Sequence, residues 1–303
     1  MKFSKTPVVI LLIILTSPIT GTAQKAQETG LEDPAWLKEF VHKRIVYSVP
    51  AMEQVRVRKD LTYKRAAGAD LKMDVYSPAN SQASQRLPAV VFIHGGRIPP
   101  NLRTKPKDWG AYISFGQLVA ASGFVGVTFN HRFHTWESLS DSQSDVMDLI
   151  AHIRTKAESL GIDKDRIVLW AVSAGGIFLS QPLRDVPPYV RGIVSYYGVL
   201  DLQNMRKEAP ASVTDEVLKE YSPLYQLSKN NKATPPIFIA RAGLDDAALN
   251  AGADRFVQTA LANNITVDLT NHAQGHHGFD IDGDNDRSRE IIKRTLDFIR
   301  AHS

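Results

Sequence analysis

Six short apolar runs, separated by longer stretches of helical character, are the feature of this 303-residue chain that most limits how it can fold. A strand that is apolar along its whole length must be buried on both faces, as in a parallel sheet covered by helices. Strands that alternate with helices are typical of βαβ units. We therefore expect parallel strands at 89–93, 124–129, 166–170, 192–196, 236–240 and 265–269, with helices over 109–122, 141–160, 174–183, 248–263 and 286–302.

Two segments nearer the N-terminus, 54–59 and 71–76, alternate polar and apolar residues on either side of a turn at 67–70, as half-buried antiparallel strands do. They complete an α/β fold with a mostly parallel eight-stranded sheet and helices on both faces. Before them, Asp33-Pro34 fits an N-cap followed by proline at the first helical position, which predicts a helix from Ala35 to about Tyr47.

The first 23 residues have the pattern of a secretory signal peptide. Lys2 and Lys5 precede the apolar run 8–15, and Gly21-Thr22-Ala23 offers small residues at a cleavage point. The run is too short for a membrane span of ~20 residues, so no stable membrane anchor is expected. We predict an exported protein, periplasmic or secreted, whose remaining residues 24–303 form one domain. The polar stretch 201–233 within it is a candidate cap or inserted loop.

Composition excludes several classes of protein. Apolar residues at 43% and charged residues at 22% are ordinary globular proportions. The formal net charge is only +4 and no block of Lys and Arg is present, so we expect no nucleic-acid partner. The chain has no cysteine, which excludes disulfides, thiolate nucleophiles and Cys-ligated zinc. Nothing in the pattern fixes the oligomeric state.

A serine stands at the junction between a predicted strand and a predicted helix. The strand 166–170 leads into Ala171-Val172-Ser173-Ala174-Gly175-Gly176 and then into an apolar helix. A nucleophile on such a tight turn needs small residues two positions before and two positions after it, a need that Ala171 and Gly175 meet. Ala171 replaces the first glycine of the usual G-x-S-x-G pattern. The alternative is a small-residue N-cap on an ordinary helix.

The tripeptide His94-Gly95-Gly96 directly follows the predicted strand 89–93. Glycines there let backbone N–H groups turn toward the oxygen that becomes negative in a tetrahedral intermediate. Together with the N–H group of Ala174, Gly95 and Gly96 are therefore candidates for an oxyanion hole. Taken alone, two glycines after a strand are more often a simple turn.

A serine nucleophile needs an imidazole base, and the imidazole works best when a carboxylate orients it. Asp245 and Asp246 follow the strand 236–240, and His276 and His277 follow the strand 265–269. Both partners thus come after the serine, in the order Ser, Asp, His. The spacing leaves the choice within each pair open.

These motifs together resemble those of the hormone-sensitive-lipase-like and related acetylesterase group of α/β-hydrolases, which is also similar to the catalytic domain of prolyl oligopeptidases. The resemblance extends from about Leu71 onward and rests on His94-Gly95-Gly96, Ser173-Ala174-Gly175-Gly176, Gly243-Leu244-Asp245 and His277-Gly278-Phe279. It implies that the catalytic residues are Ser173, Asp245 and His277.

Three further side chains are candidate substrate-binding residues. Arg97 stands where the family has a third oxyanion-loop glycine and could meet a substrate carboxylate or hydroxyl, with a solvated surface arginine as the alternative. Trp136 and Tyr197 follow the ends of predicted strands and could line a pocket, although aromatic residues there are also common in cores.

Four aspartates near the C-terminus, Asp280, Asp282, Asp284 and Asp286, suggest calcium at first sight. Gly283, however, falls at the fourth position of that run, whereas an EF-hand loop needs glycine at the sixth. We therefore expect a solvated loop that caps the last helix. No metal or cofactor is expected, because nucleophile, base and oxyanion donors are all side chains or backbone groups.

The resemblance implies a serine hydrolase that cleaves small carboxylic esters, of short-chain acyl or acetyl type, through an acyl-enzyme. The expected partner is a small-molecule ester. One alternative is a small-peptide peptidase of prolyl-oligopeptidase type. Another is a catalytically silent relative that binds a ligand in the same pocket, although such a protein has no need of all three of Ser173, Asp245 and His277.

Overall fold

An eight-stranded sheet forms the centre of the computed structural model, which describes residues 35–82, 84–229 and 233–303. Its strand order is β1-β2-β4-β3-β5-β6-β7-β8. β1 (Arg56–Ala66) and β2 (Ala69–Ser77) form an antiparallel hairpin, and β2 pairs antiparallel with β4 (Val125–Phe129). The other neighbouring strands are parallel, so the predicted mostly parallel sheet is confirmed.

Side chains on both faces of the central strands are buried, as continuous apolar runs require. Along β5, Leu169 contributes to the core on one face and Trp170 to the core on the other. Each of the six predicted apolar strands overlaps an observed one. Besides β4 these strands are β3 (Leu87–Ile93), β5 (Ile162–Val172), β6 (Val190–Tyr196), β7 (Ile237–Ala242) and β8 (Val267–His272).

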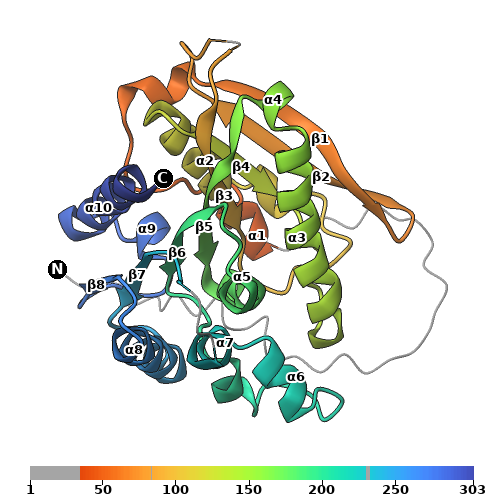
Figure 1. Ribbon diagram of the computed structural model, residues 1–303, viewed down its shortest axis with the longest axis vertical. Helices are drawn as coiled ribbons and strands as arrows, with labels where there is room; N and C mark the ends of the chain where they lie inside the picture. The colour runs from red at the N-terminus through yellow and green to blue at the C-terminus, as the bar shows by residue number, and fades with distance from the viewer. Residues whose placement is uncertain (1–34, 83, 230–232) are drawn as a thin grey trace.

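Helices cover both faces of the sheet. Residues of α3 and α8 pack into one hydrophobic core, and residues of α2 and α10 pack into the other. Figure 1 shows α3 and α10 on opposite sides of the sheet. The main helices are α2 (Gly110–Ala121), α3 (Leu139–Thr155), α4 (Ala157–Leu160), α5 (Ser180–Asp185), α8 (Ala247–Ala262) and α10 (Asp286–His302).

The first described helix is shorter than the sequence suggested. α1 (Ala35–Phe40) ends well before Tyr47, so the prediction of a helix to that residue was wrong. The backbone N–H of Ile45 donates to the hydroxyl of Ser114 instead, and the N–H of Val46 donates to the carbonyl of Asp280. These tertiary partners replace the helical hydrogen bonds. The predicted cap at Asp33-Pro34 lies outside the described residues.

The polar stretch 201–233 is built mainly of short helices. They are the 3-10 helix η6 (Leu202–Met205), α6 (Asp215–Glu220) and α7 (Pro223–Lys229), while residues 230–232 are not described. α7 packs against α5 and α8 at the edge of the molecule seen in Figure 1. Its role as a cap, and the extent of the domain, stay predictions.

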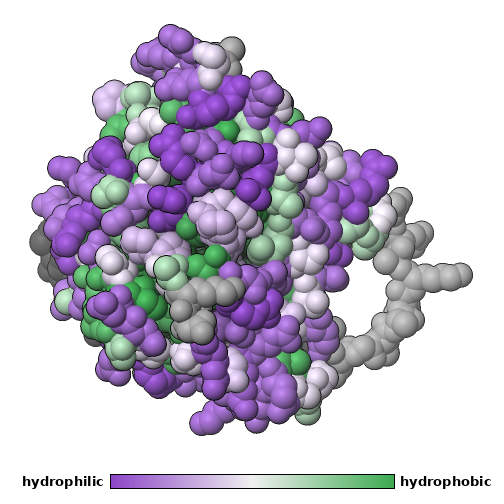
Figure 2. Space-filling model, viewed as in Figure 1, coloured by the Kyte–Doolittle hydropathy of each residue, from purple (hydrophilic) through white to green (hydrophobic). Residues whose placement is uncertain are grey.

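Polar residues cover most of the face of the molecule that Figure 2 shows. Hydrophobic residues gather on the side where Figure 1 places α8 and β8. In the described part of the chain, none of the helices combines the length and the apolar character that crossing a bilayer requires. The predicted signal peptide, residues 1–23, lies outside the described residues.

Candidate active site

The turn after β5 holds Ser173 in a backbone conformation that is rare for a residue with a side chain. Its φ angle is 55°, in the left-handed region, at the start of the 3-10 helix η5 (Ser173–Leu179). The turn lies tight against β3, since a Cβ on Gly175 would come within 2.3 Å of the carbonyl oxygen of Ile93. A strained turn of this kind presents a serine hydroxyl at the end of the strand.

Ala171, the departure from G-x-S-x-G, is accommodated by the sheet. It is the second-last residue of β5 and pairs with Ile93 of β3 and Ser195 of β6. Its small side chain is fully buried there. The turn begins only after it, so this position has room for a methyl group and does not require glycine.

The structure brings His277 and Asp245 together with Ser173. Nε2 of His277 lies 2.8 Å from Oγ of Ser173, and Nδ1 lies 2.7 Å from Oδ2 of Asp245. The carboxylate neighbour assigns the proton to Nδ1, which leaves Nε2 free to accept a hydrogen bond from the serine hydroxyl. The other carboxylate oxygen of Asp245 accepts the N–H of Asp246. Nucleophile, base and orienting acid are thus linked in one chain.

Asp246 and His276, the residues adjacent to Asp245 and His277, have different surroundings. Asp246 is exposed and its side chain caps α8 by accepting the N–H of Ala248. His276 is also exposed. The geometry therefore joins Asp245 and His277, and neither of the adjacent alternatives, to Ser173.

The loops that carry Asp245 and His277 are bonded to each other. Gly243 lies so close to Ala273 that a Cβ on it would come within 2.6 Å of the Ala273 carbonyl oxygen. The N–H of Gly243 donates to His272, and the N–H of Leu244 donates to Gly275. Backbone contacts thus fix the distance between the loop after β7 and the loop after β8.

The glycine loop after β3 adjoins the serine turn. A Cβ on Gly95 would lie 2.7 Å from Cβ of Ser173 and 3.2 Å from the amide nitrogen of Ala174, so only glycine fits. Gly96 has a φ of +78°, which also favours glycine. The N–H of Gly95 donates to the hydroxyl of Tyr112 at 3.2 Å. The predicted donors Gly95, Gly96 and Ala174 therefore come together, with the Gly95 amide already engaged.

Two buried histidines, His94 and His131, pack against each other next to the glycine loop. The ring of His94 stacks on the ring of His131, with centroids 3.6 Å apart and an interplanar angle of 5°. Burial holds the pKa of His94 well below its usual value and lowers the pKa of His131 to about 3, so both rings are neutral. His131 was missed in the sequence, where only His94 had a motif around it.

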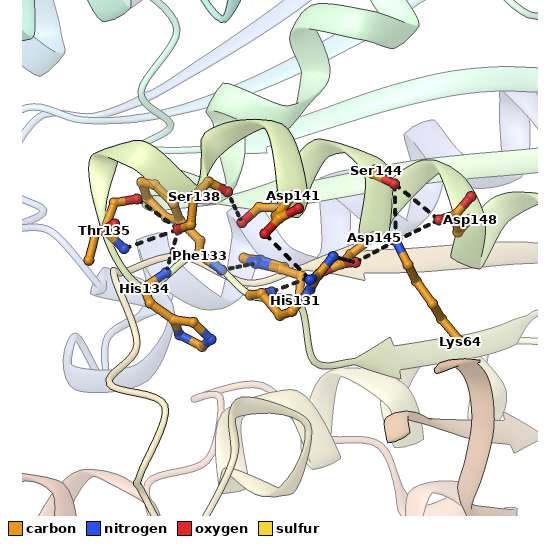
Figure 3. A network of polar contacts seen from close by, with 12 residues as sticks. Lys64, His131, Phe133, His134, Thr135, Ser138, Asp141, Ser144, Asp145 and Asp148 are labelled. Atoms are coloured by element: carbon orange, nitrogen blue, oxygen red, sulfur yellow. Dashed lines mark hydrogen bonds and ion pairs between the residues drawn. The ribbon is translucent and has the colours of Figure 1, made fainter. Parts of the chain in front are cut away.

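An ion-pair network fixes the loop that carries His131. The guanidinium of Arg132 donates to both carboxylate oxygens of Asp145, at 2.9 and 2.8 Å. Lys64 of β1 lies 2.8 Å from the same fully buried carboxylate and 2.6 Å from Asp148 (Figure 3). The network therefore ties the loop after β4 to α3 and β1, and the histidine stack passes this support on to the glycine loop.

The three candidate substrate-binding residues lie in different surroundings. Arg97 is partly buried, with its guanidinium carbon 5.8 Å from the ring centroid of Trp136. Trp136 is buried. Tyr197 is also buried, with its ring centroid 4.4 Å from that of His277 and its hydroxyl bonded to Asp280. Contact of these residues with a substrate stays a prediction.

The sheet and the serine turn after β5 define an α/β-hydrolase fold. Solved structures of esterase 2 from Thermogutta terrifontis share this fold. The propionate-bound form has a TM-score of 0.66 at 20% identity and covers 83% of this chain and 96% of that chain. The butyrate-bound form has a TM-score of 0.64 at 21% identity, covering 83% and 94%.

The chain belongs to the BD-FAE family, whose family model matches residues 73–264. It is similar to bile salt-activated lipase of Bos taurus, 26% identical over 57% of this chain and 30% of that protein. Pyrethroid hydrolase Ces2e of Rattus norvegicus is 27% identical over 41% of this chain and 22% of its own length. The chain thus spans less than a third of the length of these curated relatives.

Proposed function

We propose that this protein is a carboxylesterase-type serine hydrolase that cleaves small carboxylic esters through an acyl-enzyme. The observation that carries the proposal is the hydrogen-bonded series from Ser173 through His277 to Asp245, at 2.8 and 2.7 Å. Three loops that are far apart in the sequence bring the nucleophile, the base and the orienting carboxylate into contact, as serine hydrolysis needs. The names of the related lipase and hydrolase support an ester as the substrate.

In the first step, His277 removes the proton of the Ser173 hydroxyl as Oγ attacks the ester carbonyl carbon. His277 then donates this proton to the leaving alcohol, and the acyl group stays on Ser173. In the second step, His277 deprotonates a water molecule that attacks the acyl-enzyme, and it then returns this proton to Oγ of Ser173 as the acid leaves. Asp245 holds the imidazole and stabilises its charged form.

Backbone amides stabilise the oxygen that becomes negative in each tetrahedral intermediate. Gly96 and Ala174 supply the two donors in this proposal. The N–H of Gly95 donates to the hydroxyl of Tyr112 in the structure. Gly95 becomes a third donor when this N–H turns partly or fully from Tyr112 to the substrate oxygen.

The p-nitrophenyl ester series from acetate upward tests this function. We expect the wild-type protein to hydrolyse the acetate and propionate fastest, with kcat/KM falling as the acyl chain grows, because the related esterase holds propionate and butyrate. A serine-directed sulfonyl fluoride should stop the reaction and add its mass to the peptide that contains Ser173. A folded protein that hydrolyses no ester but cleaves a proline-containing dipeptide amide would favour the peptidase alternative. A protein inert toward both would favour the silent ligand-binding alternative.

Arg97 and Trp136 are proposed to recognise a polar group of the substrate. Arg97 is partly buried, so its guanidinium is less hydrated than that of a surface arginine. This burial lowers the pKa of Arg97, and the charge of Glu137 acts in the opposite direction. The indole N–H of Trp136 is buried and has no hydrogen-bond partner among the described residues. A carboxylate or hydroxyl would satisfy such donors.

Arg97→Ala should therefore change substrate preference. We expect kcat/KM for an ester that carries a carboxylate to fall ~10-fold relative to a neutral ester of the same length, since a charge-assisted hydrogen bond contributes ~1.5–3 kcal/mol. The control is Arg103→Ala, which alters an exposed arginine six positions further along the chain. If the ratio of the two rates stayed unchanged in Arg97→Ala, recognition of acidic substrates by Arg97 would be refuted.

Export is also part of the proposal. We infer that residues 1–23 direct the protein out of the cytoplasm and are then removed, as the pattern around Lys2, Lys5 and Ala23 indicates. The mature chain acts in the periplasm or outside the cell, on small esters that it meets there.

A further inference from the structure

A buried carboxyl group lies three residues after the proposed catalytic histidine. Asp280 is on the short helix α9 (Phe279–Asp282) and its side chain is fully buried. One carboxylate oxygen accepts the hydroxyl of Tyr197, and the other has no hydrogen-bond partner among the described residues. The expectation of a solvated loop was therefore wrong for Asp280. Burial of an incompletely bonded carboxyl is costly, and such groups concentrate at functional sites.

Tyr197 connects this carboxyl group to the proposed active site. Its ring centroid is 4.4 Å from that of His277, and its hydroxyl donates to Asp280. Its φ angle of 38° is left-handed, which is strained for a bulky residue, and its N–H donates to the carbonyl of Ala240. Hydrogen bonds at both ends of Tyr197 thus hold a strained residue against the imidazole.

Among the described residues, His277 is a basic group whose charge acts on Asp280. The charged and titratable groups that interact with it come from α2, the end of β6, and the loop and helix around α9, and they are Tyr112, Tyr196, Tyr197, His277 and Asp282. Tyr112 also accepts the N–H of Gly95 in the glycine loop. Asp280 is thus linked to the base through Tyr197, and its charge also acts on Tyr112, the tyrosine that accepts from the oxyanion loop.

We infer that Asp280 is a positioning residue that, through Tyr197, holds the imidazole of His277 in place and stabilises its positively charged form during the reaction. This inference deepens the proposed function and rests on it. The imidazolium that forms when Ser173 loses its proton then has two carboxylates near it, Asp245 in direct contact and Asp280 behind the Tyr197 ring. Because Asp280 and Tyr197 are buried, a second fixed negative charge there lowers the energy of that state more than it would in water.

The protonation of Asp280 fits this role at neutral pH. Burial raises the pKa of Asp280 to about 6, while the hydrogen bond from Tyr197 and the charge of His277 act in the opposite direction. The carboxyl is therefore largely ionised above pH 6 and loses its charge below it. The stabilisation of the imidazolium by Asp280 is available at neutral pH and disappears in acid.

The test uses Asp280→Asn and Tyr197→Phe, with Asp282→Asn as the matched control. Asparagine keeps the shape of the side chain and removes the charge, and phenylalanine keeps the ring and removes the hydroxyl. Asp282 lies on the same helix, but its carboxylate faces the surface and pairs with Lys43 at 2.8 Å. For each variant, thermal unfolding is recorded first, and kcat and KM for p-nitrophenyl acetate are then measured across the pH range.

We expect Asp280→Asn to lower kcat ~10-fold with little change in KM, and to move the acidic limb of the pH profile to lower pH by about half a unit or more. The limb moves down because the imidazolium loses a stabilising negative charge, so the base is freed at a lower pH. Tyr197→Phe should act in the same direction with a smaller effect, because removing its hydrogen bond favours the neutral form of Asp280. Asp282→Asn should stay much closer to the wild type, because it leaves the Asp280 carboxyl and its hydrogen bond from Tyr197 in place.

A reduced kcat with an unmoved acidic limb in both variants would overturn the inference, because a purely structural role lowers the rate at every pH alike. Wild-type rates in both variants would overturn it as well. If Asp280→Asn does not fold, Tyr197→Phe decides alone. An independent reading comes from NMR of the His277 ring, whose titration should move to lower pH in Asp280→Asn even if no ester is cleaved. Activity that survives Ser173→Ala would instead refute the proposed function.

Discussion

Ser173→Ala is expected to lower kcat for p-nitrophenyl acetate by ~10⁶-fold, the order of loss seen when a serine hydrolase loses its nucleophile. The substitution removes the oxygen that forms the acyl-enzyme and leaves His277 without a proton to accept. The methyl side chain retains Cβ, so the tight turn against Gly95 and Gly175 keeps its packing. Steady-state assays at high enzyme concentration measure the residual rate.

Ser195→Ala is the matched control for this prediction. Ser195 is a fully buried serine on the neighbouring strand β6, and its hydroxyl has no hydrogen-bond partner in the described part of the chain. Its loss should leave kcat within a few-fold of the wild type. If Ser173→Ala kept more than a small fraction of the wild-type rate while folding normally, another group would have to be the nucleophile.

The second large effect on kcat is expected from substitutions in two pairs of adjacent residues. Asp245→Asn should lower kcat ~10⁴-fold, because an amide no longer fixes the proton on Nδ1 of His277 or stabilises the imidazolium. Asp246→Asn should change kcat little, since asparagine also caps a helix well. His277→Gln should remove nearly all activity, whereas His276→Gln alters only an exposed side chain.

Kinetic measurements on the four variants, each checked by thermal unfolding, test directly whether Asp245 and His277 are the catalytic members of their pairs. Equal losses for Asp245→Asn and Asp246→Asn would mean that the loop after β7 matters only for its shape. A larger loss for His276→Gln than for His277→Gln would contradict the geometry, which places the ring of His277 2.8 Å from Ser173.

The sequence predicted those parts of the site that depend on local pattern. Ser173 could be singled out as the candidate nucleophile because a strand, small residues and an apolar helix follow one another within a few positions. Gly95 and Gly96 stand directly after a buried strand for the same reason. The choice of Asp245 and His277 needed the family resemblance, because adjacent residues of the same type have almost the same spacing.

The parts of the site that the sequence did not predict depend on contacts between segments that are far apart in the chain. His131 lies beneath the glycine loop only because β3 and β4 are neighbours in the sheet, so nothing around it in the sequence reveals its role. Asp280 looked like one member of a polar run, and its hydrogen bond to Tyr197, the residue directly after β6, joins segments that are far apart in the sequence. The end of α1 at Phe40 has the same origin, since Ser114 and Asp280 take over the amides that would have continued it.

The backbone bonds between the loops after β7 and β8 have a consequence for how this site responds to change. Gly243 and Leu244 donate to His272 and Gly275, so Asp245 and His277 lie on two loops that are bonded together as one unit, while Ser173 lies on the turn after β5. A bulky substrate that pushes this unit outward would lengthen the contact to Ser173 and leave the bond between Asp245 and His277 intact. We therefore expect tolerance for larger substrates to depend on the contacts between this unit and the serine turn, where substitutions would widen the site most directly.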